Sequence, residues 1–124
     1  MSIEALKELF DRYSREYTDF IGIELSDPNQ EGMGEDCPIH IAARMGLIDD
    51  VNLLINSGAD VNKPGELGMT PIHYAAMRNQ VGIVKVLVSN GANINSKNDF
   101  GETPLDWAIN RNSDDVVTYL RSKG

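Results

Sequence analysis

The chain has 124 residues, and its 11 lysines and arginines against 19 aspartates and glutamates give a formal net charge of −8. This length suits a single domain with its own core, and the 41% hydrophobic content is ordinary for a folded protein. No apolar run is long enough to cross a membrane, the first residues lack the apolar stretch of a secretory signal, and the negative charge disfavours nucleic acid as a direct partner.

The N-terminal third predicts one amphipathic helix followed by an acidic loop. Apolar residues at spacings of three and four predict the helix over residues 3–19, with Ser2 as its N-cap. These apolar residues are Ile3, Leu6, Phe10, Tyr13 and Tyr17. A turn is expected at residues 27–29, whereas the sequence does not predict a conformation for residues 20–34.

Most of the negative charge belongs to this same segment. Residues 1–36 contain ten acidic and three basic residues, whereas residues 37–124 contain nine acidic and eight basic ones. The acidic residues have two interpretations at this stage. They form a solvated helix face and a polar loop, which we favour, or a negative surface that attracts a cationic partner.

A seven-residue motif occurs three times at intervals of 33 residues. It reads CPIHIAA at residues 37–43, TPIHYAA at residues 70–76 and TPLDWAI at residues 103–109. The two 33-residue segments that begin at residues 35 and 68 are identical at ten positions. A fixed period of this length predicts a stack of repeated units.

Each unit predicts two helices with a loop after them. Thr70 and Thr103 suit a helix N-cap, and each precedes a proline that suits the first helical turn. Gly58 and Gly91 follow the second helix, where a left-handed residue ends it. The second helices carry apolar residues at helical spacing, namely Ile48, Val51, Leu54 and Ile55, and then Val81, Val84, Leu87 and Val88.

These motifs and their period resemble the ankyrin repeat. The resemblance implies an all-α fold, an ankyrin-repeat solenoid of about three helix-turn-helix units with an N-terminal capping helix. The expected divisions are residues 1–34 for the capping helix and acidic loop, 35–67 and 68–100 for two repeats, and 101–124 for a C-terminal capping repeat. In the last unit the polar residues Asn110 and Arg121 replace apolar ones, so we expect its outer face to be exposed to solvent.

No catalytic or metal-binding pattern emerges from the residue types. His40 and His73 share one slot of the repeat and are expected to bond the N-cap threonine and the loop backbone; Asp106 takes this slot in the third unit. Cys37 replaces the N-cap threonine, and an inert thiol is favoured over a reactive one. We therefore predict no enzyme activity, no cofactor and no metal site.

The resemblance implies a protein partner, bound at the loop tips and at the exposed side of the first helices. In the loops, Leu67, Met69 and Phe100 are predicted to face solvent within an acidic rim of Glu66, Asp99 and Glu102. The first-helix candidates are Arg44, Met45, Met77, Arg78, Asn110 and Arg111, with Trp107 as a secondary one. Core packing is preferred for Tyr74 and Trp107, and the alternative for Leu67 and Phe100 is packing beneath the loop.

The loop of the first unit departs from the pattern. Glu35 stands where the other units have glycine, so the sequence does not predict its geometry or a binding role for Met33 or Asp36. As a whole, we expect a cytoplasmic monomer that binds a basic protein and inhibits or sequesters it, as an immunity protein neutralises a toxin. The alternative is an adaptor that tethers partners without blocking their activity.

Overall fold

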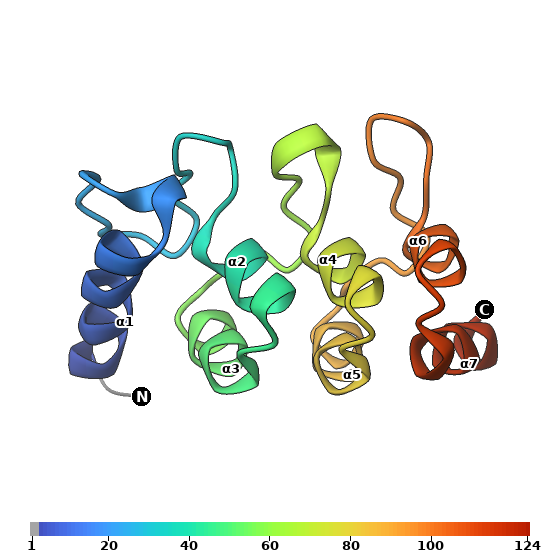
Figure 1. The fold of residues 1–124 in the computed structure, drawn as a ribbon. Helices are drawn as coiled ribbons and strands as arrows, with labels where there is room; N and C mark the ends of the chain where they lie inside the picture. The colour runs from blue at the N-terminus through green and yellow to red at the C-terminus, as the bar shows by residue number, and fades with distance from the viewer. Residues whose placement is uncertain (1–2) are drawn as a thin grey trace.

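The computed structural model describes residues 3–124 as an elongated stack of helices, with no strand among these residues (Figure 1). One helix precedes three pairs of helices, and two short 3-10 turns lie in the loops. In chain order the elements are α1 (Ile3–Glu16), η1 (Thr18–Phe20), α2 (Pro38–Met45), α3 (Ile48–Asn56), η2 (Glu66–Gly68), α4 (Pro71–Met77), α5 (Val81–Ser89), α6 (Pro104–Asn110) and α7 (Asp114–Lys123).

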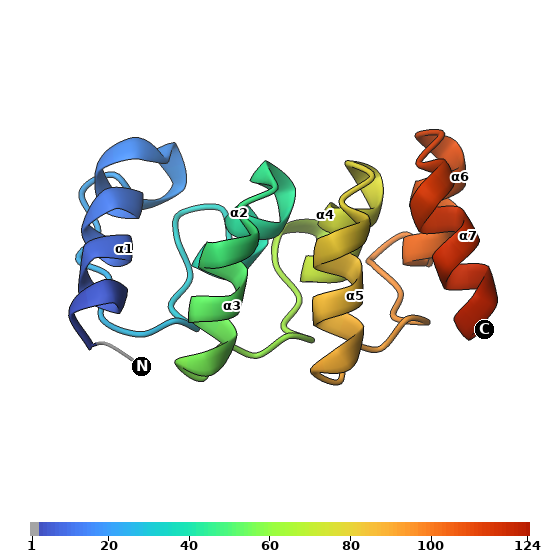
Figure 2. The same cartoon turned by 90° about the horizontal axis from the view of Figure 1, so that it is seen from below.

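The helices form two rows. The first helices of the pairs, α2, α4 and α6, contact one another in sequence and form the inner row. The second helices, α3, α5 and α7, form the outer row, and α1 packs against α3 at the N-terminal end (Figures 1 and 2). This arrangement confirms the predicted all-α solenoid with an N-terminal capping helix.

Capping hydrogen bonds form at the predicted N-termini of the inner helices. In α6 the Thr103 hydroxyl accepts the Asp106 N–H at 3.2 Å, and the Asp106 carboxylate accepts the Thr103 N–H at 3.0 Å. In α4 the Nδ1 of His73 accepts the N–H of Thr70 at 3.1 Å, while its Nε2 donates to a loop carbonyl. The structural roles predicted for His73 and Asp106 are thus confirmed.

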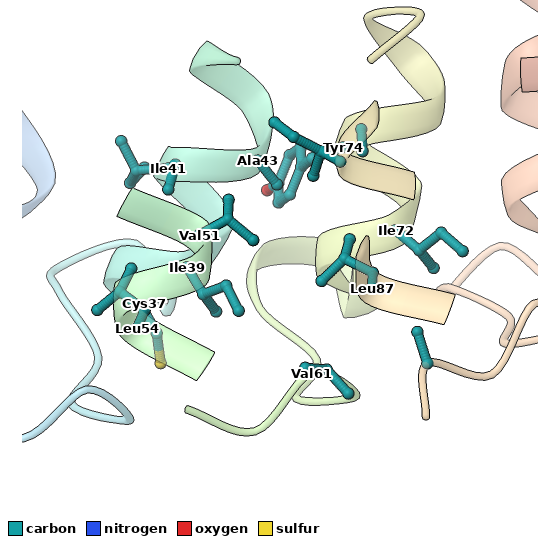
Figure 3. Packing of buried hydrophobic residues seen from close by; sticks show 14 of the residues in the cluster. Cys37, Ile39, Ile41, Ala43, Val51, Leu54, Val61, Ile72, Tyr74 and Leu87 are labelled. Carbon is teal, nitrogen blue, oxygen red and sulfur yellow. The ribbon is translucent and has the colours of Figure 1, made fainter. Parts of the chain in front are cut away.

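The core lies between successive helix pairs. Val51 and Leu54 of α3, and Val84 and Leu87 of α5, are fully buried, as the helical spacing predicted. Small residues allow the inner helices to approach, and Figure 3 shows Ala43 in the space between α2 and α4. Because each pair buries its apolar face on the next pair, no unit has a complete core of its own.

The N-terminal helix differs from the prediction at both ends. It ends at Glu16, and η1 follows it as a separate turn, so the predicted extension to residue 19 was wrong. Ile3 is 86% exposed and does not belong to the buried face, which includes Leu9 instead. Ser2, the expected N-cap, lies outside the described residues.

Three loops project from the inner helices, and we call them finger 1 (residues 32–36), finger 2 (residues 65–69) and finger 3 (residues 98–102). Each finger is closed by the same hydrogen bond, in which the N–H of its first residue donates to the carbonyl of its last at 2.8, 2.8 and 3.0 Å. Finger 1 therefore has the same geometry as the other two fingers, although its sequence did not predict this. Glu35 adopts the left-handed φ of 74° that the other fingers give to Gly68 and Gly101.

The C-terminal end of the stack is only partly polar. Arg121 and Asn110 are exposed as expected. Ile109, however, is 49% exposed at the position where earlier units bury Ala43 and Ala76. No helix within residues 3–124 is both long and apolar enough to cross a membrane.

Candidate functional site

A groove of about 250 Å³ lies between the fingers and the inner helices. Fingers 2 and 3 form one wall, and α2, α4 and α6 supply the other wall and the floor. Its lining residues are Arg44, Glu66, Leu67, Met69, Tyr74, Met77, Asn98, Phe100 and Trp107.

The groove contains about half of the side chains that the sequence singled out. Predicted candidates that line it are Arg44, Glu66, Leu67, Met69, Met77, Phe100 and Trp107. Those outside its lining are Met45, Arg78, Asp99, Glu102, Asn110 and Arg111. The sequence reasoning missed Asn98, whereas it preferred core packing for Tyr74, which is 6% exposed and touches the groove only at the edge of the core. Tyr74 shares its repeat position with Trp107, and both residues line the groove.

Two large apolar side chains stand at the tips of neighbouring fingers. Leu67 is 52% exposed and Phe100 is 69% exposed, so neither packs beneath its loop. Leu67 also has a left-handed backbone, with φ of 57° and ψ of 25°. Neither burial nor backbone conformation therefore requires leucine at this position.

The residue at the end of finger 2 does not face solvent. Met69 is only 6% exposed, and its sulfur accepts a hydrogen bond from the Nδ2 of the buried Asn98 at 3.4 Å. The prediction that Met69 is a solvent-facing contact was therefore wrong, because the neighbouring finger covers it. Met69 can contribute to the groove only as part of its wall.

The acidic rim is also less uniform than predicted. The carboxylate of Glu102 accepts the Nδ2 of Asn98 at 2.9 Å, and the Glu102 N–H donates to the Oδ1 of the same amide. Glu102 is therefore half-buried and helps to close finger 3, contrary to the solvent-facing role expected for it. Glu66 and Asp99, in contrast, are exposed at the finger tips.

Two aromatic rings of the inner helices lie under arginines. The guanidinium carbon of Arg44 lies 5.7 Å from the centroid of the Tyr74 ring, and that of Arg111 lies 5.4 Å from the Trp107 ring. These distances are typical of cation–π interactions, which hold each cation on its ring. Arg44 and Trp107 line the groove, whereas Arg111 lies outside its lining, on the ring of Trp107.

A buried carboxylate joins finger 1 to the next unit. Asp36 is inaccessible to solvent, and its Oδ1 accepts the backbone N–H of Glu66 at 2.9 Å. The Tyr74 hydroxyl donates to the same carboxylate at 3.0 Å, and burial together with this negative charge raises the pKa of Tyr74. Farther along the row, the Asp99 N–H donates to the Leu67 carbonyl at 3.0 Å. The fingers are therefore tied to one another.

The histidines and the cysteine have structural surroundings. Nδ1 of His40 accepts the Cys37 N–H at 2.8 Å and Nε2 lies 2.7 Å from the Lys63 carbonyl, which fixes the neutral ring with its proton on Nε2. Burial lowers the pKa of both His40 and His73. Burial also raises the pKa of Cys37 to about 11, so this thiol is protonated at neutral pH, as an inert residue would be.

A comparison with family models identifies the repeated unit. The model described as ankyrin repeats, in three copies, matches residues 39–124. This range includes all six paired helices except the first residue of α2, and it includes fingers 2 and 3. No curated protein matches the chain.

Proposed function

Because the chain belongs to the ankyrin-repeat family, whose repeats are protein–protein interaction modules, we propose that it binds a partner protein in the groove between its fingers and inner helices. The proposal places Leu67 and Phe100 at the centre of the contact. Arg44, Met77 and Trp107 complete it from the inner helices. Interfaces of this kind combine an apolar centre with a polar rim.

The observation that carries this proposal is the conformation of Leu67. A left-handed backbone costs a residue with a side chain about 1 kcal/mol, and glycine or asparagine relieves that cost. Leu67 accepts the cost while leaving half of its surface in water. Binding to an apolar surface of a partner explains why an exposed leucine occupies a strained position.

The finer proposal is that the chain inhibits or sequesters a basic protein in the cytoplasm and acts as a monomer. Its net charge of −8 and the exposed carboxylates of Glu66 and Asp99 support a basic partner. One cysteine, kept as a buried thiol, suits a reducing compartment. An immunity protein that covers a toxin is one case of such an inhibitor. An adaptor that leaves its partner active is the alternative.

The test is affinity capture from native lysate with matched baits. The first bait is the wild-type chain, and the second carries Leu67→Asn and Phe100→Ser. The third carries Ile3→Ser and Ile48→Ser, which remove two exposed apolar side chains from α1 and α3, away from the groove. Glu102 is left intact because its carboxylate holds finger 3.

We expect the wild-type and Ile3/Ile48 baits to retain one stoichiometric protein that the Leu67/Phe100 bait loses. Retention by all three baits would place the contact elsewhere on the surface. The captured protein is then assayed with and without the chain. Loss of its activity in a one-to-one complex supports an inhibitor, whereas unchanged activity supports the adaptor.

A further inference from the structure

We propose that the occupant of the groove is a single α-helix of the partner, lying along the stack, with basic residues on its finger side and acidic residues on its inner-helix side. The inference rests on the proposed function and specifies the conformation and charge pattern of the bound segment. It is carried by the charges of the two walls and by the spacing of the units.

The two sides of the groove, taken with its rim, carry opposite charges. On the finger side, Glu66 lines the groove and Asp99, next to Phe100 in the chain, lies outside the lining; both residues are exposed. On the inner-helix side, Arg44 lines the groove over the Tyr74 ring, and Arg111 lies outside the lining, over the Trp107 ring. A segment that fills the groove and continues along the stack therefore meets negative charge along one edge and positive charge along the other.

The spacing of the units selects the conformation of that segment. Leu67 and Phe100 occupy equivalent positions of successive units, and packed helices are about 8–10 Å apart. A helix rises 1.5 Å per residue, so about seven residues cover this distance, and residues seven apart lie on one helical face. Apolar residues at the same position of successive heptads in the partner can then contact successive finger tips.

An extended strand does not satisfy the same spacing. It covers about 10 Å in three residues, and side chains three apart in a strand point to opposite faces. A polyproline II segment returns to one face every three residues, so the experiment must distinguish it from a helix. A helix has an apolar face with a flank on each side, which matches the apolar groove between walls of opposite charge.

The charge pattern also limits which helices fit. A helix with lysines on both flanks would bring one row of cations against Arg44 and Arg111. A helix with glutamates on both flanks would bring one row of anions against Glu66 and Asp99. Like charges at such distances oppose binding, so a helix with one basic and one acidic flank is favoured.

The probes are three synthetic helical peptides of about 18 residues, which span about 27 Å. All three carry the same heptad pattern of leucines on one face. The flanks are Lys and Lys in the first peptide, Glu and Glu in the second, and Lys and Glu in the third. A fourth peptide repeats the Lys/Glu pattern with central prolines that prevent a helix. Binding to the full chain is measured by calorimetry at low and physiological salt.

We expect the Lys/Glu peptide to bind about tenfold more tightly than the other two helical peptides, since each of several exposed ion pairs contributes a few-fold. The double variant Arg44→Glu and Arg111→Glu should reverse this order and favour the Lys/Lys peptide. The matched control Lys85→Glu and Lys123→Glu changes the net charge equally at the α5/α7 surface around Tyr119. It should leave the order unchanged.

Three results would overturn the inference. If the Lys/Lys peptide binds wild type best, net charge decides binding and the inner wall has no role. Equal binding by the proline-containing peptide would assign the groove to an extended or polyproline segment. Absence of binding by all four peptides would exclude a helical occupant of this pattern. Lysate capture that still depends on Leu67 and Phe100 would then leave the proposed function standing.

Discussion

At Leu67, the residue that favours stability differs from the residue that favours binding. Its left-handed backbone favours asparagine, so we expect Leu67→Asn to raise the free energy of unfolding by about 0.5–1 kcal/mol. The same change should weaken capture of the partner because an exposed apolar side chain is lost. Urea denaturation measures the first effect, and titration with the captured partner measures the second.

Leu67→Ala is the control for this prediction. It removes most of the side chain but keeps a Cβ in the same left-handed conformation. Stability should therefore stay near that of wild type, while binding falls as it does for asparagine. A clear loss of stability in either variant would show that Leu67 contributes to the fold, and the argument from backbone strain would no longer hold.

The buried His73 predicts a dependence of stability on pH. Burial lowers its pKa in the folded chain, although nearby Glu102 and Asp106 act in the opposite direction. Below the unfolded pKa of about 6.5, the unfolded chain binds more protons than the folded one, so stability falls as the pH falls. His40 contributes with the same sign. The loss is at most about 1.4 kcal/mol per pH unit for each histidine.

Thermal melts between about pH 7.5 and 5 check this prediction against the variant His73→Asn. The variant should be less stable at neutral pH, because the bond from Nε2 to the Glu102 carbonyl is lost. Its melting temperature should fall less steeply with acidification than that of wild type. Parallel curves for the two proteins would assign the acid sensitivity to groups other than His73.

At the scale of elements, the sequence predicted the helices better than the loops. The inner helices depend on local chemistry, since an N-cap, a proline and a capping side chain recur within four residues of each motif. Finger 1 lacked this signal because Glu35 replaces the expected glycine, yet it adopts the same left-handed φ. A second periodic signal was available. Asn29 and Asn62 each donate to the carbonyl of a helix-ending loop, at 3.0 Å in both units.

The candidate site was predictable only in part for a similar reason. The repeat period located the finger tips, and the exposed Leu67 and Phe100 are found there. It could not show that Met69 is covered, because that burial depends on Asn98 of the following finger. Asp36 was missed because its two donors belong to the next unit. Contacts between units depend on the exact placement of neighbouring loops, which the repeat motif does not encode.

The capping helix α1 is attached by a polar contact where other units use an apolar one. Asp50 accepts a hydrogen bond from Arg12 at 2.7 Å and one from the Tyr13 hydroxyl at 2.9 Å. The equivalent residues of the later units, Ile83 and Val116, are apolar and buried. At this position of the repeat, Asp50 therefore replaces an apolar side chain with an acceptor for two side chains of α1.

We expect Asp50→Ala to lower the free energy of unfolding by about 1–3 kcal/mol, because it leaves the buried Tyr13 hydroxyl without its acceptor. Arg12→Ala should cost less, about 1 kcal/mol or below, since its side chain is 38% exposed. Asp49→Ala, in the same turn of α3 but exposed, is the control and should cost about 0.5 kcal/mol or less. Urea denaturation ranks the three. Equal losses for Asp49 and Asp50 would exclude a specific attachment of α1 through Asp50.

At the scale of the whole molecule, the fingers behave as one surface only if the units are coupled. The row is tied at each step, by Met33 N–H to the Asp19 carbonyl at 2.9 Å, by Asp36 to finger 2, and by Asp99 to Leu67. A partner that contacts several fingers then meets a surface that is already ordered. Such ordering lowers the entropic cost of binding.

Asp36 gives the clearest measure of this coupling, since one buried carboxylate serves finger 2 and α4 at once. Asp36→Ala leaves the Glu66 N–H and the Tyr74 hydroxyl without their acceptor, and we expect a loss of about 2–3 kcal/mol in the free energy of unfolding. Tyr74→Phe removes only one of the two bonds and should cost about 1 kcal/mol. The double variant should cost less than the sum by about 1 kcal/mol, because both changes break the same bond.

Urea denaturation of the four proteins completes the cycle, and hydrogen exchange at the Glu66 amide reports on the finger itself. Exchange should accelerate in Asp36→Ala but stay slow in Tyr74→Phe, because the latter keeps the bond from Glu66 to Asp36. Partner affinity should follow the exchange rate rather than the loss of stability. Additive losses with unchanged exchange would mean that each finger is held by its own unit, and the ordered row would then have no part in binding.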